Sequence, residues 1–486
     1  MIPQNQIDLL RGEIGGYVLQ PGEPGYSAAI AIDNGRVDRP PAAVVFPFGV
    51  EDVRRTVRFV RDNNIPFTIL SGGHSATGYC LNRGGLVLDM SSMGAMKLDA
   101  GRQVLRVQAG ATWQDVYNYM QRSGTGLLPV GGGCLSVGVP GFVLGGGMGF
   151  LSRSLGMSID NLLSIVLVTA DGEVKRLSTE STGDDAELFW ACRGGGGGNF
   201  GVAVEMEMRV HPPNSPTLLG GTIYYPLDRI EEILGFYNEW IETVPDTLAV
   251  YGYLGHSPGM PTQTVQSIRF EPVFNGPFEE GLELIQPLLR LNPLTVTLDN
   301  VTLIEFENIM GNSTQVNRLF AYIRSGTMAP RSLTPEVARI FRKSMSHPPS
   351  PDSFAIWMHT GGKMSAVSPT ATAYPHRDAS FVFELKSIWD SEADARVNVE
   401  WGYRFVEELQ PHFTGAYVNY IDPLLQNWQE RYYGVNYPKL LRIKERVDPD
   451  GFFKFQQAVG SKFEPAGGEP LDLSPLNRTF LAPDPA

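Results

Sequence analysis

The stretch Ser71-Gly72-Gly73-His74-Ser75 decides the fold, and it follows directly on Pro66 to Leu70, an apolar run typical of a strand. Backbone N–H groups in such a Gly-rich turn form a nest that binds anions, and glycine lets the backbone approach a ligand without a side-chain clash. The segment therefore predicts a pyrophosphate site. Taken alone, it fits an ordinary turn with a surface histidine equally well.

A second glycine-dense segment lies about sixty residues further on. It reads Gly131-Gly132-Gly133-Cys134-Leu135-Ser136-Val137-Gly138-Val139-Pro140-Gly141, followed by Gly145-Gly146-Gly147-Met148-Gly149. Each glycine costs roughly 0.5–1 kcal/mol in a helix or strand, so we expect no regular element here but a loop that lines a ligand. The strand–turn–helix context and downstream acid of a nucleotide-binding βαβ unit are missing. Cys134 alone fits a buried small hydrophobe equally well.

The surrounding pattern predicts an α+β fold. Residues 40–110 alternate strand and helix, with Val53, Val57 and Val60 at helical spacing, and Thr112 and Asp115 are placed to begin a helix. A strand from Val202 to Val210 ends at His211-Pro212-Pro213, where we place a domain boundary. The first domain is thus 1–212, with its ligand contacts starting at about residue 40.

Residues 213–414 predict one large antiparallel sheet with helices on one face. A long amphipathic helix runs from Leu227 to Ile241. The expected strands are Ala249–Leu254, Thr264–Val273, Val296–Ile304 and Phe381–Ile388. Residues 415–465 form a third part, with a strand from Ala416 to Tyr420 and a helix from Tyr437 to Glu445, and 466–486 an extended tail.

Composition excludes some classes of protein. The net charge is -13, which argues against nucleic acid and anionic membranes as partners. No run of 18 apolar residues predicts a membrane span, and the first ten residues lack a secretory signal. We expect a soluble protein, cytoplasmic, or secreted if a signal peptide was removed. Three cysteines make no disulfide framework, and no metal site is predicted.

Several ordered motifs resemble one family. The two glycine-rich segments, Asp160-Asn161 with Asp171-Gly172, and Leu188 to Val202 resemble the FAD-binding domain (PCMH-type) of the vanillyl-alcohol-oxidase superfamily. Tyr432-Tyr433-Gly434-Val435-Asn436-Tyr437-Pro438 and Asp448 to Gln457 resemble the carboxyl end of its berberine-bridge-enzyme branch. The likeness covers roughly residues 40–212 and 415–460, and it implies a two-part FAD-binding domain beside the substrate domain.

The resemblance implies FAD held by two covalent bonds, an 8α-histidyl bond from His74 and a 6-S-cysteinyl bond from Cys134. Cys80 and Cys192 lack such a glycine frame, so we interpret both as structural. By motif position, further flavin contacts are expected from Ser71, Gly72, Gly73, Ser75, Val137, Gly138, Gly141, Gly145, Gly146, Asn161, Gly201, Val202, Asn436 and Gln457. Many family members carry a histidine where this chain has Phe142, near flavin N1.

The resemblance also implies oxidation of an alcohol or lactol carbon on a carbohydrate or secondary metabolite. Val137 resembles the residue that admits dioxygen, which predicts an oxidase that releases hydrogen peroxide. The same fold also hosts oxidative cyclases and dehydrogenases. A flavin-loaded binding protein without turnover is a further alternative.

The family pattern nominates Tyr420 as the catalytic base. A free tyrosine has a pKa near 10 and needs a nearby cation, for which Lys363 and Arg377 are candidates. On a strand, Tyr420 would share a face with Val418, opposite Tyr417 and Asn419. Residues 368–372 contain no acid, so we expect no carboxylate helper from that segment.

Overall fold

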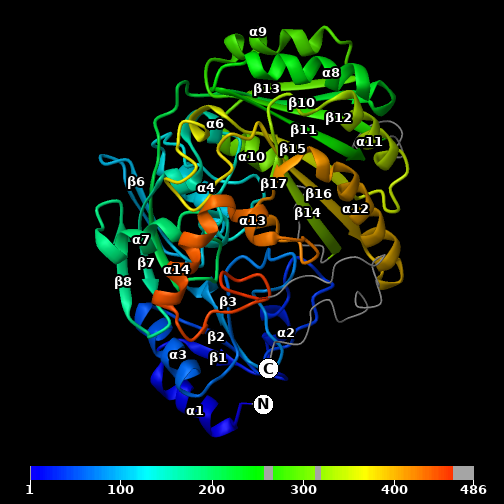
Figure 1. Cartoon of the computed structure of the whole chain (residues 1–486). Coiled ribbons are helices and arrows are strands. Elements are labelled where there is room, and N and C mark those ends of the chain that lie inside the picture. The colour runs from blue at the N-terminus through cyan, green and yellow to red at the C-terminus, as the bar shows by residue number, and fades with distance from the viewer. Residues whose placement is uncertain (1, 257–265, 312–318, 463–486) are drawn as a thin grey trace.

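The computed structural model describes residues 2–256, 266–311 and 319–462. Within these residues the strands form three sheets, of four, five and eight strands. The two smaller sheets are built from the amino-terminal part of the chain and the large sheet from the middle, and Figure 1 shows them in separate halves of the molecule.

The four-stranded sheet carries the first glycine-rich segment. Its order is β1 (Tyr17–Leu19), β2 (Ala43–Phe46), β4 (Leu86–Asp89) and β3 (Phe67–Leu70). The pairs β2–β4 and β3–β4 are parallel, and β2 and β4 are buried throughout, as continuous apolar runs predict for parallel strands. The buried face of α3 (Val50–Asp62) packs on this sheet, and β3 ends at Leu70, directly before the Ser71–Ser75 turn.

The five-stranded sheet is antiparallel and adjoins the second glycine-rich segment. Its order is β5 (Met96–Asp99), β6 (Val104–Gln108), β9 (Val202–Arg209), β7 (Leu162–Val168) and β8 (Val174–Ser178). Helix α4 (Trp113–Ser123) starts at the predicted Thr112, whose side chain forms a capping box with Asp115. Helix α7 (Gly183–Ala191) packs beside β8.

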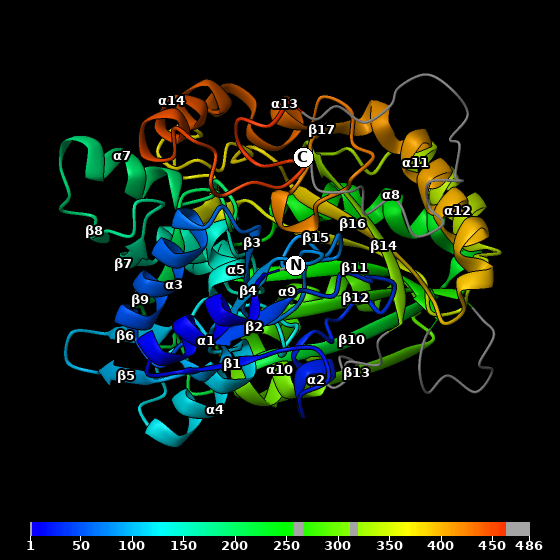
Figure 2. The same cartoon turned by 90° about the horizontal axis from the view of Figure 1, so that it is seen from below.

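The large sheet is antiparallel and presents one face to the rest of the molecule. Its order is β13 (Thr295–Val301), β10 (Leu218–Pro226), β12 (Gln266–Phe274), β11 (Leu248–His256), β15 (Phe354–His359), β16 (Phe381–Trp389), β14 (Phe320–Met328) and β17 (Phe413–Gly415). One core joins these strands to α8 (Ile230–Trp240), α9 (Phe278–Leu289), α11 (Pro335–Met345) and α12 (Ala395–Leu409). Figure 2 shows these helices around the sheet. The prediction for β12 began at Thr264, which lies outside the described residues.

The carboxyl-terminal segment returns to the amino-terminal half. Helix α13 (Trp428–Tyr433) contacts β17 of the large sheet, and α14 (Tyr437–Val447) contacts α7. Lys444 on α14 is buried and donates to the Asn199 and Phe453 carbonyls and to the Asp448 carboxylate. These bonds fix the returning segment against the loop before β9.

Two expected elements are wrong in position or type. Residues 139–144 form a short helix, α5 (Val139–Leu144), inside the segment expected to lack one. Only one glycine lies within it, Pro140 suits the first turn, and burial of Val143 and Leu144 offsets the glycine cost. The strand expected to end at Ile304 ends at Val301, because Thr302 and Glu305 form a capping box that begins α10 (Leu303–Gly311).

The strand expected at Ala416–Tyr420 is also wrong. The strand β17 lies earlier, and Val418–Tyr420 forms the single 3₁₀ turn η8, with the Tyr420 N–H donating to the Tyr417 carbonyl. Side chains three apart on a 3₁₀ turn lie on the same side. The Tyr417 and Tyr420 rings therefore meet edge to face, with centroids 5.3 Å apart, instead of facing opposite ways.

The predicted boundary at residue 212 falls between β9 and β10, which belong to different sheets, whereas β17 spans the predicted boundary at 414. The predicted tail, 466–486, lies outside the described residues. In the part of the chain that the structure describes, no helix is both long enough and apolar enough to cross a membrane.

Candidate active site

The two glycine-rich segments lie against each other through their backbones. A Cβ atom on Gly72 would lie 2.1 Å from the Gly138 nitrogen, and one on Gly138 would lie 2.3 Å from Ser71 Oγ. Only glycine fits at such distances. A cavity of about 360 Å³ adjoins this contact and is lined in part by Ser71, Gly72 and Gly73. The structure thus brings together residues that were predicted separately as ligand contacts.

His74 and Cys134 converge on the hydroxyl of Ser136. His74 Nε2 lies 2.8 Å from Ser136 Oγ, and the same hydroxyl lowers the pKa of the Cys134 thiol two residues before it. On its other side, His74 Nδ1 lies 3.8 Å from Asp33 Oδ2, and Lys386 Nζ on β16 lies 3.6 Å from that oxygen. An imidazole and a thiol sixty positions apart therefore share one set of neighbours.

Burial governs the protonation of both groups. It lowers the pKa of His74, an effect that the Asp33 charge partly opposes, so the imidazole is held neutral. It raises the pKa of the Cys134 thiol, an effect that the Lys386 charge partly opposes. Both side chains are thus held in their neutral forms. The negative charge of Asp33 acts on His74, and the positive charge of Lys386 acts on Cys134.

Tyr420 is related to this pair through Glu384, an acid whose charge raises the pKa of both Tyr420 and Cys134. The Tyr420 hydroxyl donates to Met358 Sδ at 3.8 Å. Glu384 precedes Lys386 by two residues on β16, so both side chains point to the same face of the sheet. Burial, with the Glu384 charge adding to it, raises the pKa of Tyr420 well above its usual value. Burial also raises the pKa of Glu384, partly offset by Lys386.

The two cations expected near Tyr420 are not there. Lys363 lies on η5 (Gly362–Met364) with its side chain exposed. Arg377 is buried and forms two 2.8 Å hydrogen bonds with the Asp160 carboxylate. The expectation of a cation that lowers the pKa of Tyr420 is therefore wrong, because burial and the Glu384 charge raise that pKa instead.

Two further glycines lie against the η8 turn. A Cβ on Gly145 would lie 1.9 Å from Asn419 Oδ1, and one on Gly146 would lie 3.1 Å from the Tyr417 ring. Asn419 Nδ2 donates to the Phe142 carbonyl and to the Tyr417 hydroxyl. The turn that carries Tyr420 is thus fixed to the second glycine-rich segment. In that segment Val137 is half-buried, and Gly141 is exposed with open space beside it.

The side chain of Asn161 is held by protein groups, and its contact with the ring edge stays a prediction. Its amide donates to the Leu155 and Met157 carbonyls, and its Oδ1 lies 2.7 Å from His211 Nε2. These contacts occupy the side chain in holding the turn before β7. Gly201 and Val202 lie at the start of β9, where a Cβ on Gly201 would lie 2.7 Å from the Val168 carbonyl. Ser75 Oγ accepts from the Tyr79 N–H.

Asn436 and Gln457 belong to the returning segment, as predicted, and both are buried. Asn436 Nδ2 donates to the carbonyls of Pro369, Thr372 and Ala373, so it joins this segment to a loop of the middle part. Gln457 Nε2 donates to the Asp422 carbonyl, whereas its buried Oε1 has no hydrogen-bond partner within residues 2–256, 266–311 and 319–462.

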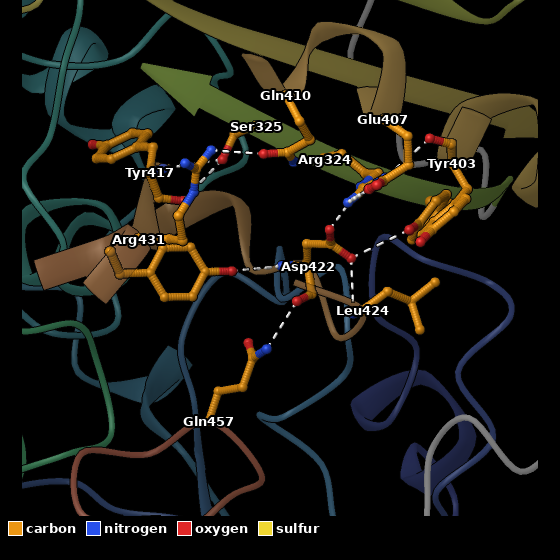
Figure 3. Close-up of polar contacts among 12 residues, drawn as sticks. Arg324, Ser325, Tyr403, Glu407, Gln410, Tyr417, Asp422, Leu424, Arg431 and Gln457 are labelled. Atoms are coloured by element: carbon orange, nitrogen blue, oxygen red, sulfur yellow. Dashed lines mark hydrogen bonds and ion pairs between the residues drawn. The ribbon is translucent and has the colours of Figure 1, made fainter. Parts of the chain in front are cut away.

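Asp422 holds the segment just after Tyr420 in place, as Figure 3 shows. Its carboxylate accepts from Arg324 Nε at 2.7 Å, from the Tyr322 hydroxyl and from the Leu424 N–H. Its own N–H donates to the Tyr432 hydroxyl. A buried ion pair and four more hydrogen bonds, with that from Gln457, therefore fix one residue two positions from the proposed catalytic phenol.

Sequence reasoning missed Asp33, Ser136, Glu384, Lys386 and Asp422. Asp33-Asn34-Gly35 has the composition of a surface turn, so its sequence gave no signal. The charges at 384 and 386 did give one, because they occupy alternate positions of an otherwise apolar strand. Such a pattern indicates a polar row on one face of a buried sheet.

The residues present fit a flavin adenine dinucleotide. The Gly72–Gly138 contact and its cavity provide the backbone nest that a pyrophosphate needs. The imidazole of His74 and the thiol of Cys134, which attacks as its thiolate, are both placed next to Ser136, and among the described residues Gln457 Oε1 is a buried acceptor without a partner. This combination defines a flavoprotein fold with a two-part cofactor domain.

Comparisons with known proteins agree. A family model described as FAD binding domain matches residues 41–178, and one described as berberine and berberine like matches residues 416–460. The uncharacterized FAD-linked oxidoreductase YgaK of Bacillus subtilis is 30% identical over 451 residues, covering 91% of this chain and 96% of YgaK. The chain belongs to the family of berberine-bridge-enzyme-like FAD-linked oxidoreductases.

Solved structures show the same fold. BBE-like 1 of Physcomitrella patens superposes with a TM-score of 0.84 at 23% identity, covering 93% of this chain and 98% of that one. A chitooligosaccharide oxidase superposes with a TM-score of 0.81 at 21% identity, covering 95% and 100%. The predicted fold, a PCMH-type FAD-binding domain beside a large antiparallel sheet, is confirmed. The protein is an FAD-dependent oxidoreductase.

Proposed function

We propose that this protein is an oxidase that removes hydride from an alcohol or lactol carbon and passes the electrons to dioxygen, giving hydrogen peroxide. The observation that carries the proposal is Glu384 on β16, two residues from the Lys386 that contacts Asp33 beside His74, with a charge that acts on both Tyr420 and Cys134. An alcohol oxidation needs a hydride acceptor and a base within hydrogen-bond reach of the hydroxyl. FAD, when bound, supplies the acceptor.

His74 and Cys134 would tether the flavin at its 8α carbon and at C6. Two such bonds raise the flavin's reduction potential and hold the ring in place, which suits oxidation of poor hydride donors. The convergence of both side chains on Ser136 supports this double tether. The other predicted contacts with the cofactor stay part of the proposal: Ser71, Gly72, Gly73, Ser75, Val137, Gly138, Gly141, Gly145, Gly146, Asn161, Gly201, Val202, Asn436 and Gln457.

Tyr420 and Glu384 would take the hydroxyl proton together. The high pKa of Tyr420 makes its phenolate an unfavourable resting state, so the phenol would donate to Glu384. When the substrate hydroxyl donates to the Tyr420 oxygen, the phenolic proton moves to Glu384, and the substrate proton replaces it. The carboxylate helper that was not expected from residues 368–372 is thus supplied by β16.

The face of the large sheet beside Glu384 is suited to a polar substrate. Residues opposite one another in the register of antiparallel strands share a face, and Arg269, Tyr253, Ile356 and Glu384 form such a row across β12, β11, β15 and β16. The Arg269 guanidinium lies 3.9 Å from the centroid of the Tyr253 ring and 2.6 Å from Glu271. Charged donors and acceptors beside an aromatic ring match the hydroxyls and apolar faces of a carbohydrate, and the likeness to a chitooligosaccharide oxidase supports that class.

Hydrogen-peroxide formation by the purified yellow protein, measured across a panel of sugars, oligosaccharides and simple alcohols, tests the proposal. We expect peroxide and a lactone or carbonyl product in equal amounts with at least one carbohydrate. Bleaching of the yellow colour without air, followed by no peroxide in air, would show a dehydrogenase instead. Absence of bleaching by every compound would favour a binding protein without turnover.

A further inference from the structure

A chain of hydrogen-bonding side chains links the two proposed tethers, and hydride transfer makes no use of it. Its central hydrogen bond joins Ser136 Oγ to His74 Nε2 at 2.8 Å; Asp33 lies 3.8 Å from His74 Nδ1 as a charge contact, and Cys134, whose pKa the Ser136 hydroxyl lowers, stands two residues before Ser136. Its members come from three separate parts of the chain, near residues 33, 74 and 135. All lie in a partly buried site, with His74 only 16% exposed.

We propose that Ser136 and Asp33 form a proton relay by which the protein attaches its own flavin. Asp33 receives the proton from His74 when the imidazole bonds to the cofactor. Ser136 carries the proton of the Cys134 thiol to the other nitrogen of His74 when the thiol bonds. This inference rests on the proposed FAD site and adds the residues that build its two covalent bonds.

The geometry fixes the direction of each hydrogen bond. With Nδ1–H facing the Asp33 carboxylate, Nε2 is the bare nitrogen and accepts from the Ser136 hydroxyl. Ser136 Oγ is then free to accept from the Cys134 thiol. This is the order of roles in an acid–imidazole–hydroxyl triad, extended by a thiol at its end. Once Nδ1 is bonded to the cofactor, Nε2 remains available, so the His74 bond forms first.

The Cys134 thiol needs a base that takes its proton before it can react. A thiolate, and not a thiol, is the attacking species, and burial raises the pKa of Cys134. Lys386 lies 3.6 Å from Asp33, and its charge favours the thiolate. Burial lowers the pKa of His74, which keeps the imidazole able to accept a proton. The relay thus connects the neutral imidazole of His74, which can accept a proton, to the Cys134 thiol, whose raised pKa makes it slow to lose one.

Both bond-forming steps balance with dioxygen as the oxidant. In the first, an N–C bond at the 8α carbon replaces one C–H bond and the Nδ1–H bond. In the second, a C–S bond at C6 replaces a C–H bond and the S–H bond. Each step leaves two electrons on the ring and releases two protons, and dioxygen takes both pairs and becomes hydrogen peroxide.

The test compares Ser136→Ala with the wild-type protein. Purified full-length proteins are denatured and digested, and mass spectrometry quantifies the peptides that contain His74 and Cys134. We expect wild-type protein to give one species in which the flavin joins both peptides. In S136A the flavin stays on the His74 peptide, and the doubly joined fraction falls about tenfold or more, as loss of acid–base assistance implies. Ser136→Thr keeps the hydroxyl and should restore the second bond.

Ser164→Ala is the matched control. Ser164 Oγ also makes one hydrogen bond, to Glu207 at 2.8 Å, but it lies on β7 outside the relay. It should give the wild-type pattern of peptides. Asp33→Asn tests the other end of the relay, and it should reduce the His74 bond so that acid releases most of the flavin.

A pH shift separates the relay from mere packing. Incubation of yellow S136A in air at pH 9.5 should generate the Cys134 bond, because hydroxide ionises the thiol directly, whereas incubation at pH 7 or without oxygen should not. Both bonds at wild-type levels in S136A would overturn the relay, as would no gain at pH 9.5. If S136A does not fold, an unchanged His74 bond in D33N overturns it.

These outcomes are distinct from failure of the proposed function. Wild-type protein with flavin on neither peptide would overturn the double tether itself and the relay with it. Singly tethered S136A that still forms peroxide from a carbohydrate would leave the proposed oxidase intact and support the relay.

Discussion

The charge of Glu384 acts on the hydroxyl of Tyr420, and this pairing sets the direction in which a substrate proton moves. Glu384 can accept that proton only when it is ionised. Because burial raises its pKa, it becomes protonated at a higher pH than an exposed glutamate. The rate of substrate oxidation should therefore fall as the pH falls through this raised pKa.

Glu384→Gln tests this role. We expect kcat/KM to fall by about 10²–10⁴-fold, the usual scale of acid–base assistance, and the acidic limb of the pH profile to disappear. Glu408→Gln, which removes an exposed partner of Lys343, should leave both unchanged. An E384Q enzyme that keeps the wild-type pH profile would remove Glu384 from the mechanism.

The proposed role of Val137 in admitting dioxygen depends on the size of its side chain, to within one methyl group. Val137→Ile adds a methylene beside the proposed flavin site. It should slow reoxidation by dioxygen about tenfold or more, the scale that one methylene has in a tight site, while reduction by substrate under anaerobic conditions stays unchanged. Stopped-flow absorbance of the two half-reactions measures both. Equal slowing of both half-reactions would assign Val137 to packing alone.

Individual residues show which parts of the candidate site could be predicted from the sequence and which could not. The glycines, His74 and Cys134 that the structure brings together could be predicted as one site, because motif and backbone requirements are local. Lys363 and Arg377 were assigned to Tyr420 because a phenol needs a cation to act as a base, but neither contacts it. Glu384 was missed although its alternation with Lys386 predicts a polar row on one face of a strand, because the partner that this row meets depends on strand register across the sheet.

At the scale of elements, the carboxyl-terminal turn is the part that the sequence predicted least well. Aromatic and β-branched residues at 416–420 favour a strand by propensity. The side chain of Asn419 instead bonds to the Phe142 carbonyl, and the backbone closes a 3₁₀ turn. Tertiary contacts with the glycine-rich segment decide the conformation here. The Thr302–Glu305 capping box, by contrast, was a local signal for the end of β13 and was overlooked.

The segment that follows the 3₁₀ turn η8 is held in place by the contacts of Asp422. Asp422→Ala leaves Arg324 buried, only 2% exposed in its side chain, without its main partner. Breaking a buried pair in this way costs about 3–5 kcal/mol, so the midpoint of urea unfolding should fall markedly. Glu239→Ala breaks the exposed pair with Arg331 and should cost about 0–1 kcal/mol. Similar losses in the two variants would contradict the importance of the Asp422 contacts.

At the scale of the whole molecule, the site is assembled from three sheets and the returning tail. The sequence predicted the two-part cofactor domain and the large sheet, because periodicity and motif order persist over long stretches. It placed the start of the ligand contacts at about residue 40, and Asp33 lies before that point. Helices α8, α9, α11 and α12 pack on one face of the large sheet, so the other face meets the cofactor domain. This choice of face could not be predicted from the sequence.

A buried acid lies where the two halves meet. Glu307 on α10 lies 3.5 Å from the Tyr117 hydroxyl on α4, and its second oxygen has no hydrogen-bond partner in the part of the chain that the structure describes. Burial raises the pKa of Glu307 to about 8. The folded protein therefore holds this proton between pH 4.5 and 8, where the unfolded chain has lost it, and stability falls as the pH rises across that window.

Glu307→Gln removes this pH dependence. Each pH unit in the window costs the native protein up to about 1.4 kcal/mol from this group, so the variant should unfold at a higher temperature than wild type at pH 8 and similarly at pH 5. Thermal unfolding at several pH values measures the difference. If the unfolding temperatures of variant and wild type differed by the same amount at every pH, Glu307 would not titrate as described.

The most direct test of the account is to locate the flavin after acid precipitation of the purified protein. The double tether predicts a yellow pellet and, after digestion, one flavin-bearing species that contains both the His74 and the Cys134 peptides. A colourless pellet, with free FAD in the supernatant and both peptides at their unmodified masses, would contradict it.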